Sequence, residues 1–278
     1  MLKISAVMIT FNAQANLPQV LSALGFASEI VVVDSGSTDR TVEICREFGA
    51  RVFTRGWSGY GAQKNFAIQQ ASHPWILSID ADEVVSPELA REISALEENT
   101  PYAGFRIPRL NHYFGRPLYH GGQYPDLQLR LFSTGRGRYN HRPVHESVEL
   151  EGPAGLLSGV ILHYSYETIS DYFEKFERYT SLEAERLLAA GEQPTALRLA
   201  QQMFLRPCWK FLWRYFFKLG FLDSTAGLLA ALFNSFTMIV SYAKCWEKAG
   251  ENPPGAKRPD RRPGAHHSGD NRSGQKPS

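Results

Sequence analysis

Hydrophobic and polar positions in the first hundred residues alternate between short β-rich runs and stretches with helical character. The run Glu29–Asp34 (EIVVVD) has an apolar centre, which is typical of a parallel strand that is covered on both faces. Short links join each run to the next, so the alternation predicts right-handed crossovers and a parallel sheet. We expect strands at Lys3–Thr10, Glu29–Asp34, Ala50–Thr54 and Trp75–Ile79, and helices at Asn16–Ala23, Arg40–Phe48, Gln63–Ala71 and Pro87–Glu98.

From Pro101 to about Tyr166 the pattern changes, because glycine, proline, arginine and aromatic residues crowd together and the apolar runs are short. Strand candidates remain at Gly104–Pro108, Leu127–Phe132 and Gly159–His163. We expect this part of the chain to form loops and mixed strands that face a substrate.

The C-terminal part has a helical pattern in two segments, Ser170–Ala190 and Ala196–Lys248. The last stretch, 251–278, is rich in proline, glycine and serine and lacks large apolar residues. It is expected to be a disordered basic tail.

Within the second helical segment a cation recurs every four residues, with aromatic residues in between. At about 100° per residue these cations follow one helical stripe, which Pro207 is expected to begin and Gly220 to end. A basic face beside aromatic residues suits a helix that lies on anionic lipid. The alternative is a helix docked on the protein with a solvated basic stripe. The four cations are Arg206, Lys210, Arg214 and Lys218.

The stretch that follows, 224–243, is uncharged and nominally long enough to span a bilayer. It contains several serine and threonine residues, a glycine and an asparagine. We therefore expect an amphipathic helix lying against the protein or the membrane surface rather than a transmembrane span.

Composition and charge exclude several classes of protein. Of 278 residues, 43% are hydrophobic and 21% charged, so the chain is not globally disordered, and a net charge of +2 argues against a nucleic-acid binder. The charge is uneven, because 18 basic and 23 acidic residues precede Ala200, whereas 12 and 5 follow from Ala200 onward. The three cysteines are far apart, and the apolar run Ile4–Ile9 is too short for a signal peptide. We expect a reducing compartment and a catalytic part that faces the cytoplasm.

The sequence Asp80-Ala81-Asp82 directly follows a predicted strand. In extended backbone, side chains at i and i+2 project to the same side, so two carboxylates would meet at a strand end. Such oxygen ligands suit Mg²⁺ or Mn²⁺ shared with substrate phosphates. Taken alone, the motif is common and favours the alternative of two solvated acids in the turn before the Pro87 helix.

Polar groups also follow the first two strands of the predicted sheet. Thr10-Phe11-Asn12 ends the first strand, and Asp34 ends the second, followed by Ser35-Gly36-Ser37. Small residues let a ligand approach the backbone, and Asp34 can accept hydrogen bonds from a base or ribose. An ordinary strand–turn–helix with a capped helix is the alternative for the second of these turns.

These motifs, in this order and spacing, resemble the inverting family 2 glycosyltransferases. The matching segments are MITFN (8–12), VVVDSGSTDRT (31–41), the helix start Gln63-Lys64-Asn65, and LSIDADE (77–83). The segments GGQYPDLQLRLF (121–132) and RPVHES (142–147) are similar to the branch that adds sugars to the lipopolysaccharide inner core, which includes β-1,4-glucosyltransferases.

The resemblance implies an α/β fold of the GT-A nucleotide-diphospho-sugar transferase type, with a Rossmann-like mixed sheet whose N-terminal half is mainly parallel. It implies a catalytic domain at 1–166, with a nucleotide-sugar and metal half at 1–100 and an acceptor half at 101–166. A helical, membrane-associating region at 167–250 would follow.

The resemblance also implies roles for single residues, and each role is carried over from a matching position. Thr10, Asn12 and Asp34 would bind the uridine-type nucleoside, with Ser37 and Lys64 near it or its diphosphate. Asp80 would contact ribose or assist the Mg²⁺ or Mn²⁺ ion through water, Asp82 would ligate the ion, and His145 would help hold the metal–diphosphate. Asp126 would be the catalytic base, with Glu146 as its rival. Arg130 is a candidate from its position rather than from the resemblance: on the same strand face as Gln128, it would hold a substrate phosphate or, equally, make a surface or structural pair.

We therefore predict an inverting, metal-dependent hexosyltransferase that uses a nucleotide-sugar donor, UDP-glucose first. Its acceptor would be a lipid-linked glycan, with lipopolysaccharide inner core first and a polyprenyl-linked oligosaccharide second. The enzyme would be peripheral at the cytoplasmic face of a bacterial inner membrane, bound to anionic lipid and not to nucleic acid. The non-enzymatic alternative is a catalytically inert membrane-surface binding protein.

Overall fold

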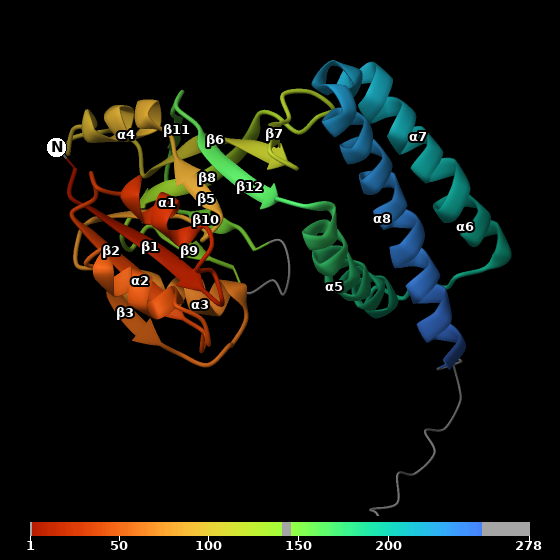
Figure 1. Ribbon diagram of the computed structural model, residues 1–278, viewed down its shortest axis with the longest axis horizontal. Helices are drawn as coiled ribbons and strands as arrows, with labels where there is room; N and C mark the ends of the chain where they lie inside the picture. Colours follow the sequence, from red (N-terminus) through yellow and green to blue (C-terminus); the bar gives the residue numbers. More distant parts are fainter. Residues whose placement is uncertain (1, 141–145, 252–278) are drawn as a thin grey trace, which may run out of the picture.

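A computed structural model describes residues 2–140 and 146–251, in which an α/β domain lies beside three long helical segments (Figure 1). The first part of the domain contains β1 (Ile4–Thr10), α1 (Leu17–Ser22), β2 (Glu29–Asp34), α2 (Thr41–Glu47), β3 (Arg51–Thr54), α3 (Tyr60–Gln69), β4 (Trp75–Ser78), β5 (Glu83–Val85) and α4 (Pro87–Ser94). The second part contains β6 (Gly104–Tyr113), β7 (Arg116–Pro117), β8 (Asp126–Ser133), β9 (Gly137–Tyr139), β10 (Val148–Leu150), β11 (Ala154–Leu156) and β12 (Ile161–Tyr166).

One mixed sheet runs through the domain in the order β3-β2-β1-β4-β8-β6-β12-β5. The strands β3, β2, β1 and β4 are parallel, whereas β8 pairs antiparallel with both β4 and β6. Strands β7 and β11 pair with β6, and β9 and β10 form a separate hairpin. The predicted, mainly parallel N-terminal half is confirmed for β1 to β4. Strand β5 is the exception in this half, because it pairs antiparallel with β12 at the far edge of the sheet.

Alternation along the central strands builds a core on each face of the sheet. Val32 belongs to the cluster that α1 and α4 cover, whereas Val31 and Val33 belong to the opposite cluster, which α3 covers through Ala67. All three valines are buried. This two-sided burial explains why the EIVVVD run has no polar alternation.

Two of the predicted boundaries that differ from the structure bear on the candidate site. Strand β6 continues past Pro108 to Tyr113 because it is paired on both sides, with β8 and β12, and these contacts outweigh the missing N–H of one proline. Strand β4 ends at Ser78, and the N–H of Glu83 donates to the carbonyl of Asp80 at 3.0 Å. Asp80 and Asp82 therefore lie in a turn between β4 and β5, not on extended backbone as expected.

The helical region consists of α5 (Ile169–Ala189), a long helix from Ala196 to Phe217, and α8 (Ser224–Glu251). The long helix contains α6 (Ala196–Ala200) and α7 (Arg206–Leu212), each followed by a π-helical turn. A side-chain capping box of Thr168 and Asp171 begins α5. In Figure 1, α8 lies between α5 and the α6–α7 helix.

The second helical segment begins at Ala196, as predicted, and Thr195 caps it through its side chain. Pro207 lies within the first two residues of α7, where a proline is tolerated, but the chain is already helical before α7. The π-helical turn 201–205 directly precedes the proline, and such a turn relieves the ring clash that breaks an ordinary α-helix. The helix ends near the predicted place, where Leu219 takes a left-handed conformation before Gly220.

Among the described residues, one helical stretch, Gly220–Gly250, is long and apolar enough to cross a membrane, and 39% of its most apolar window is buried. Ala226, Ala230 and Tyr242 are among its buried residues. Ala226 and Ala230 pack on Leu118 in the loop after β7, and the helix contacts both α5 and α7. The helix thus lies against the protein, in line with expectation. Glu251 ends α8, and the rest of the tail expected to be disordered, 252–278, lies outside the described residues.

Candidate active site

The loops after β1 and β2 are joined by hydrogen bonds around the carboxylate of Asp34. Its Oδ1 accepts from Thr10 Oγ1 at 2.9 Å and from Ser37 Oγ at 2.5 Å. Its Oδ2 accepts from the backbone N–H groups of Gly36 and Ser37, at 2.9 and 2.8 Å. Asp34 is buried, so its charge fixes the shape of the loop that follows β2.

Asn12 joins the same two loops at the surface. Its side-chain oxygen accepts from the N–H of Thr38 at 2.8 Å, and its own N–H donates to Ser37 Oγ at 2.8 Å. The structure therefore brings Thr10, Asn12, Asp34 and Ser37 together, as the sequence predicts for one sheet edge.

A cavity of about 850 Å³ opens beside these loops. It is lined by Thr10 at the end of β1, Ser35 after β2 and Tyr60 at the start of α3. Arg178 and Leu182 of α5 form its opposite wall, and Arg178 donates a hydrogen bond to the hydroxyl of Tyr60. Its volume lies in the range of small-molecule sites, which is about 300–1,000 Å³.

A chain of ion pairs begins next to α3. Lys64 Nζ lies 2.9 Å from Glu146 Oε1 and 2.8 Å from Asp80 Oδ1. The other oxygen of Asp80 lies 2.6 Å from Arg130 Nη2. Lys64 and Arg130 are both buried, and each is partnered by a carboxylate.

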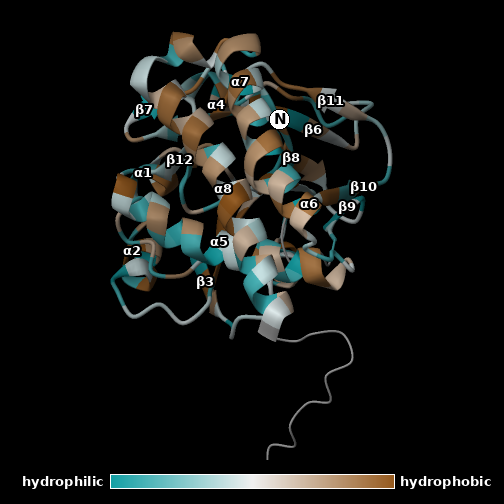
Figure 2. Ribbon diagram, turned by 90° about the vertical axis from the view of Figure 1, so that its right-hand side faces the viewer, coloured by the Kyte–Doolittle hydropathy of each residue, from teal (hydrophilic) through white to brown (hydrophobic). Residues whose placement is uncertain are grey.

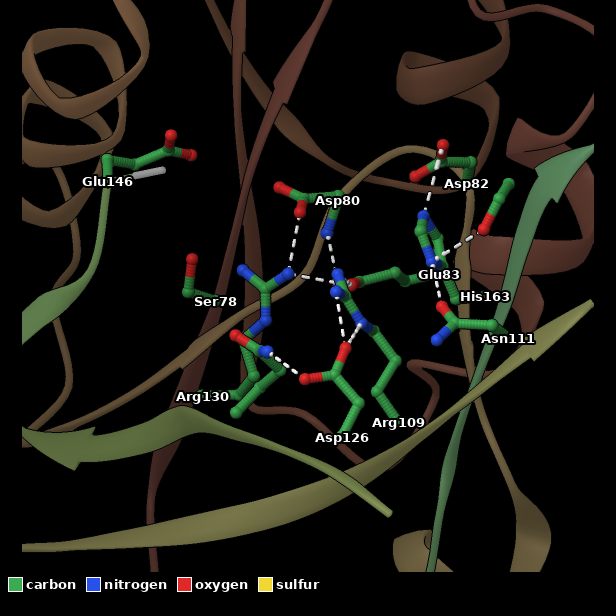
Figure 3. A network of polar contacts seen from close by, with 12 residues as sticks. Ser78, Asp80, Asp82, Glu83, Arg109, Asn111, Asp126, Arg130, Glu146 and His163 are labelled. Carbon is green, nitrogen blue, oxygen red and sulfur yellow. Dashed lines mark hydrogen bonds and ion pairs between the residues drawn. The ribbon is translucent and has the colours of Figure 1, made fainter. Parts of the chain in front are cut away.

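The chain continues through Glu83, the first residue of β5, to the start of β8 (Figure 3). Glu83 Oε1 lies 2.6 Å from Arg130 Nη2 and 3.2 Å from Arg109 Nη1, and its side chain is fully buried. Arg109 Nη2 lies 2.6 Å from Asp126 Oδ2, whose other oxygen accepts from Gln128 Nε2 at 2.6 Å. The two rival bases, Glu146 and Asp126, thus stand at opposite ends of one alternating chain of charges.

Charge pairing overrides burial for the pKa values along this chain. Burial alone would raise the pKa of Asp80, but Arg130 and Lys64 hold it far below its ordinary value. Burial alone would lower the pKa of Lys64, but Asp80 outweighs it and raises this pKa. Asp80 is therefore ionised with a cation on each oxygen, which leaves it less free than Asp82 to ligate a metal ion.

Asp82 faces a different group of side chains. Its Oδ2 lies 3.6 Å from His163 Nε2 and 3.7 Å from Lys175 Nζ. The other ring nitrogen of His163, Nδ1, lies 2.7 Å from the side-chain oxygen of Asn111, to which it donates, and 2.9 Å from Ser165 Oγ. His163 therefore faces Asp82 with its Nε2. Burial alone would raise the pKa of Asp82, but a hydrogen bond from His163 and the charge of that ring lower it.

The part of the chain that the structure describes contains no cluster of three or more His, Cys, Asp or Glu side chains with metal-site geometry. Asp82 and His163 offer one oxygen and one nitrogen ligand side by side, which fits an ion completed by substrate phosphates. His145, the expected metal ligand, lies outside the described residues.

Sequence reasoning missed Glu83, Arg109 and His163. Glu83 follows the Asp-x-Asp motif, but nothing in the sequence shows that two arginines converge on it. Arg109 falls beyond the predicted end of its strand at Pro108. His163 is the last residue of a predicted strand. The one sequence signal for its role is that Ser165, two residues later, would lie on the same face of an extended strand. Of the two roles predicted for Arg130, the structure has the structural ion pair rather than a side chain that is free to hold phosphate. The Nε atom of Arg130 is buried and has no hydrogen-bond partner among the described residues.

Comparisons with known proteins identify the family to which this chain is similar. A family model described as Glycosyl transferase family 2 matches residues 5–145. Lipopolysaccharide core biosynthesis glycosyltransferase LpsC of Rhizobium meliloti is 30% identical, over 89% of this chain and 93% of its own. An uncharacterized glycosyltransferase of Rickettsia typhi is 31% identical, over 89% and 88%. Among solved structures, S. aureus TarS 1–349 in complex with UDP-GlcNAc has 17% identity and a TM-score of 0.44, covering 88% of both chains.

Proposed function

Because the chain belongs to glycosyl transferase family 2, we propose that it transfers a hexose, glucose from UDP-glucose, with inversion to a lipid-linked glycan. The observation that carries this proposal is the position of the cavity of about 850 Å³ between the Thr10–Asp34 loops and α5. A nucleoside in this cavity would lie at the carboxyl ends of β1 and β2, where α/β sheets bind nucleotides.

Lipopolysaccharide inner core is the proposed acceptor. The named role of the R. meliloti relative in lipopolysaccharide core biosynthesis supports it. A polyprenyl-linked oligosaccharide is the second candidate, because it also presents a glycan on a lipid.

Asp82 and His163 would hold Mg²⁺ or Mn²⁺, and the expected contribution of His145 stays a prediction. When bound, such an ion neutralises charge on the leaving diphosphate. Lys64, a residue of α3, pairs with Asp80. The ammonium group of Lys64 would hold the diphosphate or position Asp80 against the ribose.

Asp126 is the proposed catalytic base. It would take the proton from an acceptor hydroxyl that attacks the anomeric carbon from the face opposite the nucleotide, so one displacement inverts the configuration. Among the described residues, Asp126 Oδ1 accepts one hydrogen bond, from Gln128, which leaves a lone pair for that proton. Glu146 remains the rival; in the part of the chain that the structure describes, it pairs with Lys64.

Membrane contact is proposed for the outer face of the α6–α7 helix. Aromatic and aliphatic side chains are exposed there, although residues of this size are normally buried. In Figure 2, which looks onto the helices, hydrophobic segments lie along α7 and α8. Such a face suits peripheral binding at the cytoplasmic surface of the inner membrane. The exposed residues include Phe204, Leu205, Trp209, Leu212, Trp213, Phe216 and Phe217.

A panel of radiolabelled nucleotide sugars, offered with Mg²⁺ or Mn²⁺ to truncated lipopolysaccharide cores and to polyprenyl-linked oligosaccharides, tests the proposal. We expect label from UDP-glucose to enter lipopolysaccharide core. Transfer only to the polyprenyl-linked acceptor would favour the second candidate. Neither hydrolysis nor transfer with any donor would leave the inert membrane-surface binding protein as the better description.

A further inference from the structure

One side of the helix α5 is fixed against α8. Its residues Tyr172 and Phe176 are buried, and their rings stack on Phe233 and Phe236 of α8, with ring centroids 4.5 and 5.5 Å apart. In Figure 1, α5 lies between α8 and the α/β domain. The packing on α8 therefore holds α5 in a defined position beside the domain.

A second side of α5 meets the α/β domain. At about 100° per residue, positions i, i+3 and i+7 share one helical face, and Lys175, Arg178 and Leu182 have this spacing. Lys175 Nζ lies 3.7 Å from Asp82 Oδ2, whereas Arg178 and Leu182 line the cavity of about 850 Å³ together with Thr10. One helical face thus extends from the candidate metal ligand Asp82 to the cavity proposed for the nucleoside.

Arg178 gives this cavity its charge. Of the described residues that line the cavity, it is the one charged side chain. Its guanidinium group donates a hydrogen bond to the Tyr60 hydroxyl and lies 5.9 Å from the ring centroid of Tyr60 and 5.6 Å from that of Tyr179. Within the described ranges 2–140 and 146–251, no carboxylate forms an ion pair with it. The cavity therefore offers an anion both room and an unneutralised cation.

Arg178 differs in this respect from the buried cations of the site. Among the described residues, Lys64 and Arg130 each contact two carboxylates, whereas the hydrogen bond of Arg178 goes to a neutral hydroxyl. Arg178 can therefore turn towards a bound anion without breaking an ion pair. Its side chain is also exposed, so an anion that enters the cavity can reach it.

A nucleoside diphosphate matches this arrangement. The nucleoside would lie at the loops of Thr10 and Asp34, and its diphosphate would extend towards the ion proposed at Asp82. The helix α5 borders both ends of that path, with Arg178 at the cavity and Lys175 beside Asp82. A guanidinium group on this path can donate two parallel hydrogen bonds to phosphate oxygens.

We propose that Arg178 binds the diphosphate of the nucleotide-sugar donor. In the transfer step, the acceptor oxygen forms its bond to the anomeric carbon, the acceptor proton goes to the base, and the bond from that carbon to the diphosphate oxygen breaks. The electron pair of the broken bond stays on the diphosphate, where Arg178 would neutralise the added charge. The proposal rests on the glycosyltransferase reaction proposed above and assigns part of its donor site to the C-terminal helices.

Binding of UDP, compared with uridine, tests the contact with the diphosphate. In the full chain with Mg²⁺, Arg178→Gln should weaken UDP binding about tenfold, the effect of one lost charge-assisted hydrogen bond. Uridine binding should stay within about twofold of wild type, because uridine has no phosphate. Isothermal titration measures UDP, and competition with UDP measures uridine. Arg186→Gln is the matched control, because Arg186 lies about two turns further along α5 and pairs with Glu183 outside the cavity.

Two further variants separate binding from a structural role of Arg178. Arg178→Lys keeps the charge and should lose less UDP affinity than Arg178→Gln. Tyr60→Phe removes the hydroxyl that accepts from Arg178 but keeps the cation, so its UDP affinity should equal that of wild type. An equal loss in Tyr60→Phe and Arg178→Gln would mean that Arg178 joins α5 to α3 rather than binding the donor.

Steady-state kinetics distinguish the donor from the acceptor. Arg178→Gln should lower kcat/KM for UDP-glucose about tenfold or more, with the KM for the acceptor within about twofold of wild type. Unchanged UDP affinity, an equal loss of uridine affinity, or an effect confined to the acceptor KM would each overturn the proposal. Failure of the wild-type protein to bind UDP would count against the proposed function instead.

Discussion

Charged and apolar side chains have opposite surroundings in the α/β domain and in the C-terminal helices. In the α/β domain, the buried cations Lys64 and Arg130 each contact two carboxylates. In the helices, Lys210 and Arg214 contact none among the described residues, and Trp209 is 58% exposed. The α/β domain thus pairs its buried cations with carboxylates. The helices leave two partly buried cations without a carboxylate among the described residues and expose large aromatic side chains.

This difference separates two kinds of evidence about function. A closed network of ion pairs positions reactive groups, and unpaired groups at a surface show where something else binds. The predictions below change one region at a time and ask whether the other is affected.

The largest effect is expected at one end of the ion-pair chain. Asp126→Asn should lower kcat by about 10²–10⁴-fold, the usual contribution of a general base, while the donor still binds. Single-turnover assays and UDP-glucose titration measure the two quantities. Activity near wild type in Asp126→Asn, together with a large loss in Glu146→Gln, would move the base to the other end of the chain.

Asp82→Ala should abolish metal-dependent turnover, a loss of about a hundredfold or more, because metal stabilisation is worth several kcal/mol. Turnover as a function of Mn²⁺ concentration is the measurement. Glu88→Ala serves as the control, since this acid lies on α4 and its ion pair with Arg91 is exposed. Wild-type metal dependence in Asp82→Ala would remove Asp82 from the metal site.

Glu83→Gln tests whether the α/β domain depends on its closed charge chain. The change leaves Arg109 and Arg130 to share one fewer negative charge in a buried position, which costs about 3–5 kcal/mol when a buried pair is broken. Urea unfolding measures the loss, and Glu88→Gln should show little change. Equal stability of the two variants would mean that the chain of ion pairs does not stabilise this part of the α/β domain.

Trp209→Ser tests the helical region. The Trp209 ring, exposed in the protein, would be buried in lipid on membrane contact, so its loss should weaken vesicle binding about tenfold. Activity on a soluble acceptor should not change. Co-sedimentation measures it, and Leu156→Ser is the control, because Leu156 is equally exposed but lies on β11 of the α/β domain. An equal loss of vesicle binding in both variants would mean that lipid contact is not a property of the helical region alone.

The smallest effect concerns pH. Burial would raise the pKa of Glu29, but hydrogen bonds from Ser5 and Ser72 and the charge of Arg51 lower it to about 2. A depressed pKa stabilises the fold above the ordinary value near 4.5, and this stabilisation is lost as the pH falls towards 2. Glu29→Gln should therefore be slightly less stable than wild type at pH 7, with the difference disappearing by pH 2. A difference in urea midpoint that is constant with pH would contradict this assignment.

Much of the α/β domain could be predicted because its information is local. Apolar runs such as Glu29–Asp34 mark strands, and Ser86 caps the helix that begins at Pro87. The match to the family model and the mixed sheet confirm the expected GT-A fold of the N-terminal part, and the helical C-terminal part is confirmed with it. The polar groups after β1 and β2 meet because parallel strands place their ends at one edge.

What could not be predicted depends on contacts between distant parts of the chain. Glu83 joins Arg109 and Arg130, 26 and 47 residues away, and no motif encodes that convergence. His163 approaches Asp82 because β12 pairs with β5, a pairing set by the whole sheet. Pro207 lies inside a continuous helical segment because the π-helical turn before α7 relieves the clash of its ring, and no local pattern predicts that turn. The proposed roles of the site residues, and the domain boundaries, stay predictions.

The helix α5 belongs both to the cavity at the sheet edge and to the C-terminal helical region. Its residues Arg178 and Leu182 form a wall of the cavity at the sheet edge, while its other side packs on α8. A protein shortened to residues 1–166 would retain every strand of the sheet and still leave this cavity open along one side. The sheet and the helices are therefore not interchangeable modules, and a helical region transplanted from a relative would have to bring its own cavity wall.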